Sequence, residues 1–217
     1  MSGDYSRLGS RRWPIYDGTL LQQGRPLTDR DWNDLVAQLN RRDQAAVLDG
    51  SGPLMRSVAA PGAFKVTFDT TALDLKIAPG RIYVDGLLAE NFGTGDLAWD
   101  SVLAEEHGPE PVAYKHQKWM PNPPDLPASG GPYLVYLDVW RREVTHNQDG
   151  DIVEKAIGVD STSRLQTVWQ LKVFDATGVN CDTDLSTVTA FKPSSGRLNS
   201  DTEEVPGVGV DWRIGGD

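Results

Sequence analysis

Three aspartates surround a tryptophan in the segment TDRDWND, and their types and spacing could support chemistry. Asp29, Asp31 and Asp34 could bind a metal ion or act as a pair of catalytic acids. Asp31 and Asp34 are three residues apart and could approach each other on a helix, whereas Asp29 and Asp31 would not share a face. Carboxylates also stabilise the positive N-terminal end of a helix. The pattern therefore favours a structural role for the three aspartates.

The segment HNQDGDIVE, residues 146–154, has the oxygen-rich composition of a calcium-binding loop. An EF-hand loop requires glycine at its sixth position and a bidentate glutamate at its twelfth. The candidate ligands are Asn147, Asp149 and Asp151, and counted from Asn147 the glycine, Gly150, is fourth and Glu154 is eighth, so the pattern fails. Asp149 and Gly150, lying between two strand-like segments, are instead typical of a turn.

The histidines and the single cysteine do not form a recognisable site. His107, His116 and His146 lack the spacing of zinc ligands. Cys181 lies beside Asp182 and lacks the positive surroundings that would activate a thiolate. No serine or lysine lies in a known nucleophile motif. We predict that the chain is not an enzyme and binds no metal ion or cofactor.

Tryptophans offer a different chemistry, because an exposed aromatic face can stack on a sugar ring. Trp140 and Trp169 lie in strand-like segments and are predicted to be packed. Trp99 and Trp119 lie in a segment with little periodicity and are the better candidates for contact with a glycan. Packing in the core or at an interface is the alternative for both, since aromatic side chains are enriched there.

Residues 1–27 are predicted to form an extended arm, because prolines and glycines interrupt the large apolar side chains of this segment. Such an arm must lie against its own body or against a partner. Its apolar side chains are Trp13, Ile15, Tyr16, Leu20 and Leu21.

A helix is predicted over residues 28–48. Thr28 is a good N-cap, and Asp31 completes a capping-box pattern with aspartate in place of glutamate. Four apolar side chains follow at the spacing i, i+3, i+4, i+7, which places them on one face. These are Trp32, Leu35, Val36 and Leu39.

Residues 54–174 alternate apolar and polar side chains over short segments, which predicts a β-rich core domain. Pro79–Gly80 and Asp85–Gly86 are turn signals between its strands. Residues 93–131 are predicted to form a long loop. The acidic tail, residues 175–217, has a net charge of −5 and is predicted to be rich in loops.

Two segments show the clearest strand alternation. Residues 133–145 and 164–175 could each bury one face in a common core, the first more completely. The predicted fold class is α+β and mainly β, namely a β-sandwich or partial barrel with an extended N-terminal arm and one amphipathic helix.

Charge and hydropathy limit the classes of partner. The net charge of −10 disfavours binding to nucleic acid, because phosphates would be repelled. No stretch approaches the ~18 consecutive apolar residues of a membrane span, and residues 1–14 lack the apolar core of a signal peptide. We therefore expect synthesis and assembly in the cytoplasm, without membrane insertion. Residues 1–48 carry a net charge of +1, and the rest of the chain carries −11. This asymmetry is compatible with a slightly basic arm that meets the acidic body of a neighbouring copy, or it arises by chance.

Several segments, taken in order, resemble an uncharacterised bacterial domain family associated with phage tails and phage-tail-like contractile injection systems. The segments are GDYSR (3–7), QQGRPLTDRDWND (22–34), PGRIYVDGLLAEN (79–91), YLVYLDVWRREVT (133–145), TSRLQTVWQLKV (162–173) and SSGRLN (194–199). They span nearly the whole chain, and the ordered set is more specific than any one of them. Longer members continue beyond the last segment, so the resemblance implies a short member or the N-terminal part of a larger protein.

The resemblance implies a structural subunit at a baseplate, a fibre attachment or a cap, and it supplies no catalytic residues. The particle would be released or directed to a cell surface. Its partners would be other subunits, with this chain forming a symmetric homo-oligomer. The expected interface residues are Trp13, Tyr16, Gln22, Gln23, Gly24, Arg25 and Trp32. The alternative function is a carbohydrate- or cell-surface-binding module of such a particle, with Trp99 and Trp119 as glycan contacts.

Overall fold

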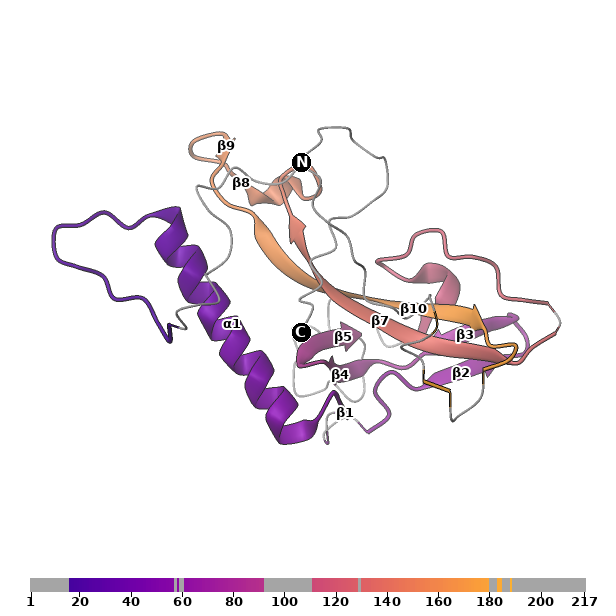
Figure 1. The fold of residues 1–217 in the computed structure, drawn as a ribbon. Helices are drawn as coiled ribbons and strands as arrows, with labels where there is room; N and C mark the ends of the chain where they lie inside the picture. Colours follow the sequence, from indigo (N-terminus) through magenta and orange to yellow (C-terminus); the bar gives the residue numbers. More distant parts are fainter. Residues whose placement is uncertain are drawn as a thin grey trace. The chain divides into compact units, whose positions relative to one another are not determined.

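The computed structural model describes residues 16–56, 58, 61–91, 111–128, 130–179, 183–184 and 188. One α-helix, two short 3-10 helices and ten strands lie in these residues (Figure 1). The helix is α1 (Asp29–Ser51). The strands are β1 (Leu54–Arg56), β2 (Val66–Asp69), β3 (Asp74–Ile77), β4 (Gly80–Val84), β5 (Leu87–Asn91), β6 (Val112–Ala113), β7 (Tyr133–Val144), β8 (Val153–Glu154), β9 (Val159–Asp160) and β10 (Arg164–Asp175). The 3-10 helices are η1 (Tyr114–His116) and η2 (Gly150–Ile152).

The strands form four small sheets, with the orders β1-β4-β5, β2-β3-β6, β10-β7 and β8-β9. The registers of β1 with β4, β2 with β3, β3 with β6 and β8 with β9 are antiparallel. The prediction of an α+β fold that is mainly β is confirmed, and the described strands do not close into one barrel. The chain divides into two compact units, residues 1–56, 82–88 and 144–164 in the first and residues 57–81, 89–143 and 165–217 in the second.

Helix α1 belongs to the first unit and begins as the sequence predicts. Thr28 is the N-cap, and its hydroxyl accepts a hydrogen bond from the Asp31 N–H. The Asp31 carboxylate accepts in return from the Thr28 hydroxyl at 2.8 Å and from the Thr28 N–H at 3.1 Å. These bonds to the charged carboxylate lower the pKa of Asp31. The capping box is therefore complete, and α1 continues three residues beyond the predicted end, to Ser51.

The hairpin between β4 and β5 attaches to α1 through backbone and amide contacts. Its two loop residues, Asp85 and Gly86, both have positive φ, as a tight two-residue β-turn requires. The Gln44 side chain donates to the Asp85 carbonyl at 2.7 Å. A Cβ at Gly86 would lie only 2.5 Å from the Gln44 carbonyl oxygen, so glycine is required at this position.

The second unit contains most of the buried apolar side chains. Trp169 on β10 is buried, and its ring meets Phe64 edge to face at a centroid distance of 5.1 Å. Its indole N–H donates to the Glu90 carbonyl at 2.7 Å, which satisfies the one polar atom of this side chain. The other buried apolar residues of this unit are Ala63, Ile77, Ala89, Tyr114, Val168, Leu171 and Ala176.

Two expectations about the strands need correction. The prediction that residues 133–145 bury a face more completely than residues 164–175 is wrong, because β10 buries Val168, Trp169 and Leu171 whereas β7 is half-buried or exposed until Val144. Part of the range predicted as a long loop is ordered into β6 and η1, and the Tyr114 side chain is fully buried there.

Candidate functional site

The N-terminal arm and one face of α1 together expose a set of large apolar side chains. Residues 16–27 contain neither helix nor strand and form an open loop beyond the first turn of α1 (Figure 1). Leu20 is 93% exposed. The exposed apolar residues of this region are Tyr16, Leu20, Leu21, Leu27, Trp32 and Leu39, and we call them the apolar N-terminal surface.

The predicted apolar face of α1 points away from the contacts that hold the helix. Trp32 is 58% exposed and Leu39 is 50% exposed, with Leu35 and Val36 half-buried beside them. Gln44, which contacts the β4–β5 hairpin, is five residues beyond Leu39, roughly 140° around the helix. No apolar side chain of α1, all of which is described, is buried. Half or more of the surface of Trp32 and Leu39 is therefore left uncovered within the described residues.

The one buried side chain of α1 is polar. Gln38 is 5% exposed, and its Oε1 atom has no hydrogen-bond donor among the described residues. An unsatisfied buried amide oxygen destabilises a fold by about 1–3 kcal/mol. The helix thus gains little from the packing that normally stabilises helices in proteins.

The residues predicted to position the arm are all exposed. Gln22, Gln23, Gly24 and Arg25 form a turn, in which the Arg25 N–H donates to the Gln22 carbonyl at 3.2 Å and Gly24 has a φ of 73°. The Thr19 hydroxyl donates to the Asp31 carbonyl at 3.5 Å, which ties the arm loosely to the first turn of α1. Two further predicted residues, Trp13 and Trp99, lie outside the described residues.

The second candidate site surrounds Trp119 in the second unit. Trp119 is half-buried, and two cations lie over its ring, the Lys118 ammonium and the Arg142 guanidinium, each 4.8 Å from the ring centroid. Arg142 projects from β7, and its Nε–H donates to the side-chain Oε1 of Gln166 on β10 at 3.0 Å. Partial burial lowers the pKa of Arg142, because desolvation disfavours the charged form.

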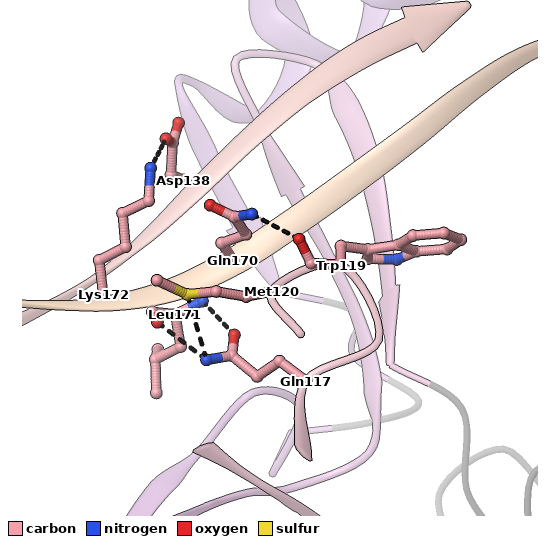
Figure 2. Close-up of polar contacts among 7 residues, drawn as sticks. All are labelled: Gln117, Trp119, Met120, Asp138, Gln170, Leu171 and Lys172. Carbon is pink, nitrogen blue, oxygen red and sulfur yellow. Dashed lines mark hydrogen bonds and ion pairs between the residues drawn. The ribbon is translucent and has the colours of Figure 1, made fainter. Parts of the chain in front are cut away.

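Side-chain amides hold the loop that carries Trp119. Buried Gln117 pairs with the backbone of β10, since its Oε1 accepts from the Leu171 N–H at 2.6 Å and its Nε2 donates to the Leu171 carbonyl at 3.0 Å (Figure 2). The same Nε2 donates to the Tyr114 carbonyl at 3.1 Å. The Gln170 amide donates to the Trp119 carbonyl, and the indole ring points away from these contacts (Figure 2).

The aspartates of the first helical turn have structural partners. Asp31 completes the capping box, and Asp34 lies 3.7 Å from the Arg30 guanidinium. In the oxygen-rich segment, Asp149 accepts from the Asp151 N–H at 3.1 Å and caps η2, in place of the simple turn that was predicted. These contacts support the structural interpretation of both segments.

The histidines do not assemble into a cluster within the described part of the chain. His116 is exposed on η1, and His107 lies outside the described residues. His146 Nδ1 lies 2.8 Å from an Asp160 carboxylate oxygen, although the geometry does not meet the criteria of a hydrogen bond. The described residues contain no group of three or more histidine, cysteine or acidic side chains that could hold a metal ion.

The described residues also contain no helix that is both long and apolar enough to cross a membrane.

Most of the residues around Trp119 are not indicated by local sequence patterns. Arg142, Gln166 and Gln170 come from two distant parts of the chain, and no local spacing connects them to Lys118 and Trp119. The alternation of residues 133–145 does place Arg142 on the same strand face as Trp140 and Asp138. That register was the one available signal.

Comparison with known protein families gives a match that covers most of the chain. The model of the family of unknown function DUF6519 matches residues 1–191, and the chain belongs to that family. Neither the curated proteins nor the solved structures gave a match.

Proposed function

We propose that this member of family DUF6519 is a structural subunit that associates with further copies of itself through the arm and helix α1. The carrying observation is that a 23-residue helix fully buries no apolar side chain, while Trp32 and Leu39 of its apolar stripe are exposed. A helix of this kind normally buries such a stripe against another element. A neighbouring subunit that covers Trp32 and Leu39 would supply that packing.

Charge supports a second copy of the chain as the occupant of this surface. The first 48 residues carry seven arginines and six aspartates, whereas the rest of the chain has a net charge of −11. A slightly basic arm on one copy would therefore be attracted to the acidic body of the next, and such complementarity favours encounter and register. Arg25 and Arg42 are exposed and available for this contact.

The larger assembly that we propose is a contractile phage-tail-like particle, with this chain at a baseplate, fibre attachment or cap. The support for this part is the ordered resemblance of the segments given above. The particle would assemble in the cytoplasm from this chain and other subunits, and the proposal assigns the chain no catalytic step.

Light scattering tests the association directly. The mass of the full chain should be that of a multimer, and a chain that begins at Thr28 should be a monomer. This truncation keeps the capping box and the whole of α1, so circular dichroism should show that the helix remains. A monomeric full chain would refute self-association, and a truncated chain that still forms the multimer would remove the arm from the interface.

A second candidate function is favoured by a separate observation. Trp119 is partly exposed in a loop that side-chain amides hold in place. An indole ring in this setting can contact a saccharide, as expected for a carbohydrate- or cell-surface-binding module. Measured binding of a saccharide to the chain, lost in Trp119→Leu, would support this function.

A further inference from the structure

We propose that Lys118, Trp119 and Arg142 form a binding site for the carboxylate group of an acidic saccharide. This inference rests on the second candidate function and names its class of ligand. It is independent of self-association, because none of the three residues belongs to the apolar N-terminal surface.

Among the described residues, the two terminal nitrogens of Arg142 have no hydrogen-bond partner. Its Nε–H is used by Gln166, and its guanidinium lies over the Trp119 ring. A guanidinium over an aromatic face keeps its in-plane N–H groups available. The two terminal nitrogens of Arg142 are therefore left as the fork that binds a carboxylate through two parallel hydrogen bonds.

Lys172 on β10 is a useful comparison, because this cation lies near an aromatic ring and also has a carboxylate partner on β7. The Lys172 ammonium lies 5.7 Å from the Trp140 ring centroid and also forms an ion pair with Asp138 at 2.6 Å. Neither Lys118 nor Arg142 has such a carboxylate among the described residues. Two cations held near one ring without a carboxylate partner make the local potential positive, which favours the binding of an anion.

The surroundings of the ring make the site rigid before a ligand binds. The Gln170 amide fixes the Trp119 carbonyl, and Gln117 fixes the preceding turn to the backbone of β10. The Met120 N–H closes that turn on the Gln117 carbonyl at 3.2 Å. A site whose groups are already in place loses less entropy on binding.

The combination of charge and ring selects the class of ligand. A polymer with dense negative charge is disfavoured, because the chain carries a net charge of −10. A saccharide with one carboxylate on a sugar ring matches one cation pair next to one half-exposed indole. The sugar ring would contact the exposed part of the indole while its carboxylate meets Arg142 and Lys118.

Calorimetric titration of the full chain tests this inference, with a short oligogalacturonate as the probe and a glucose oligomer of equal length as its neutral counterpart. The acidic oligomer should bind at least about tenfold more tightly than the neutral one. Arg142→Gln should remove that difference, and Arg142→Lys should restore little of it because lysine lacks the fork. Lys118→Gln should weaken binding a few-fold, as expected for an exposed point charge.

Lys155→Gln is the matched control, because Lys155 is exposed in the turn between β8 and β9 and its substitution changes the net charge equally. Circular dichroism checks the fold of the Arg142 variants, and exposed Lys118 gives a second test that leaves the packed arginine in place. Equal affinity for the acidic and neutral oligomers would overturn the inference but leave saccharide binding standing. Absence of binding to either oligomer would overturn both. A glutamate hexapeptide that binds as tightly as the oligogalacturonate would overturn the saccharide and assign the site to acidic peptides.

Discussion

Replacement of Trp32 by alanine should disrupt self-association much more than it disrupts the fold. A tryptophan side chain presents roughly 250 Å², of which 58% is exposed in the single chain. Covering that exposed part, about 145 Å², would contribute about 3 kcal/mol at ~25 cal/mol per Å². Because about 1.4 kcal/mol corresponds to a tenfold change in affinity, the dissociation constant should rise roughly a hundredfold.

Sedimentation velocity over a range of concentrations measures this change. Arg41→Ala is the control on the same helix, because Arg41 is exposed and lies two residues from Leu39, roughly 200° around the helix. It should leave the dissociation constant within about threefold, as expected for an exposed charge. Urea unfolding of the dilute chain should show a loss of only about 1 kcal/mol for the Trp32 variant, a usual value for one substitution.

A Trp32→Ala chain that associates as the unchanged chain does would refute this prediction. An Arg41→Ala chain that associates as weakly as the Trp32→Ala chain would do the same, since the contact would then not follow the apolar stripe. A Trp32 variant that loses several kilocalories of stability as a dilute chain would indicate that the indole packs within its own chain.

Three further predictions concern stability, each measured by urea unfolding. Gly86→Ala should cost about 2 kcal/mol or more, because of the positive φ and the 2.5 Å approach to a backbone oxygen, whereas Gly18→Ala, with nothing within 4 Å, should be nearly neutral. Hydrogen bonds, the strongest from the Lys76 ammonium, lower the pKa of Asp69 from 3.8 to about 2. The contribution of ionised Asp69 to the free energy of unfolding is therefore present above pH ~4 and is lost as the pH falls to ~2. Asp69→Asn should flatten that pH dependence. Gln38→Met should stabilise the chain by about 1 kcal/mol, because it removes a buried unsatisfied oxygen, and a loss of stability would show that this oxygen has a partner.

Local signals in the sequence predicted the local structure well. Thr28 and Asp31 marked the start of α1, and both residues make the expected capping bonds. Asp85–Gly86 marked the β4–β5 turn, because few residues other than glycine and aspartate accept positive φ there. These features depend on residues that are close together in the sequence, so the amino-acid sequence alone is sufficient to predict them.

Features that depend on distant residues could not be predicted in the same way. The alternation in residues 133–145 correctly predicted β7 but not its exposure, since burial depends on what packs against each face. The apolar stripe of α1 was found, but amphipathicity alone does not say whether a stripe faces the chain or a partner. Arg142, which lies over Trp119, bonds Gln166 only because β7 and β10 are neighbours in one sheet.

The bond pair between Gln117 and Leu171 also affects how the chain avoids uncontrolled aggregation. β10 is twelve residues long and pairs with β7, so its other edge would offer free backbone groups to strands of further copies. Gln117 occupies both the N–H and the carbonyl of Leu171, near the middle of that edge. A strand from another copy could not add there without first displacing a buried amide. Fibril-like stacking along β10 is thereby opposed.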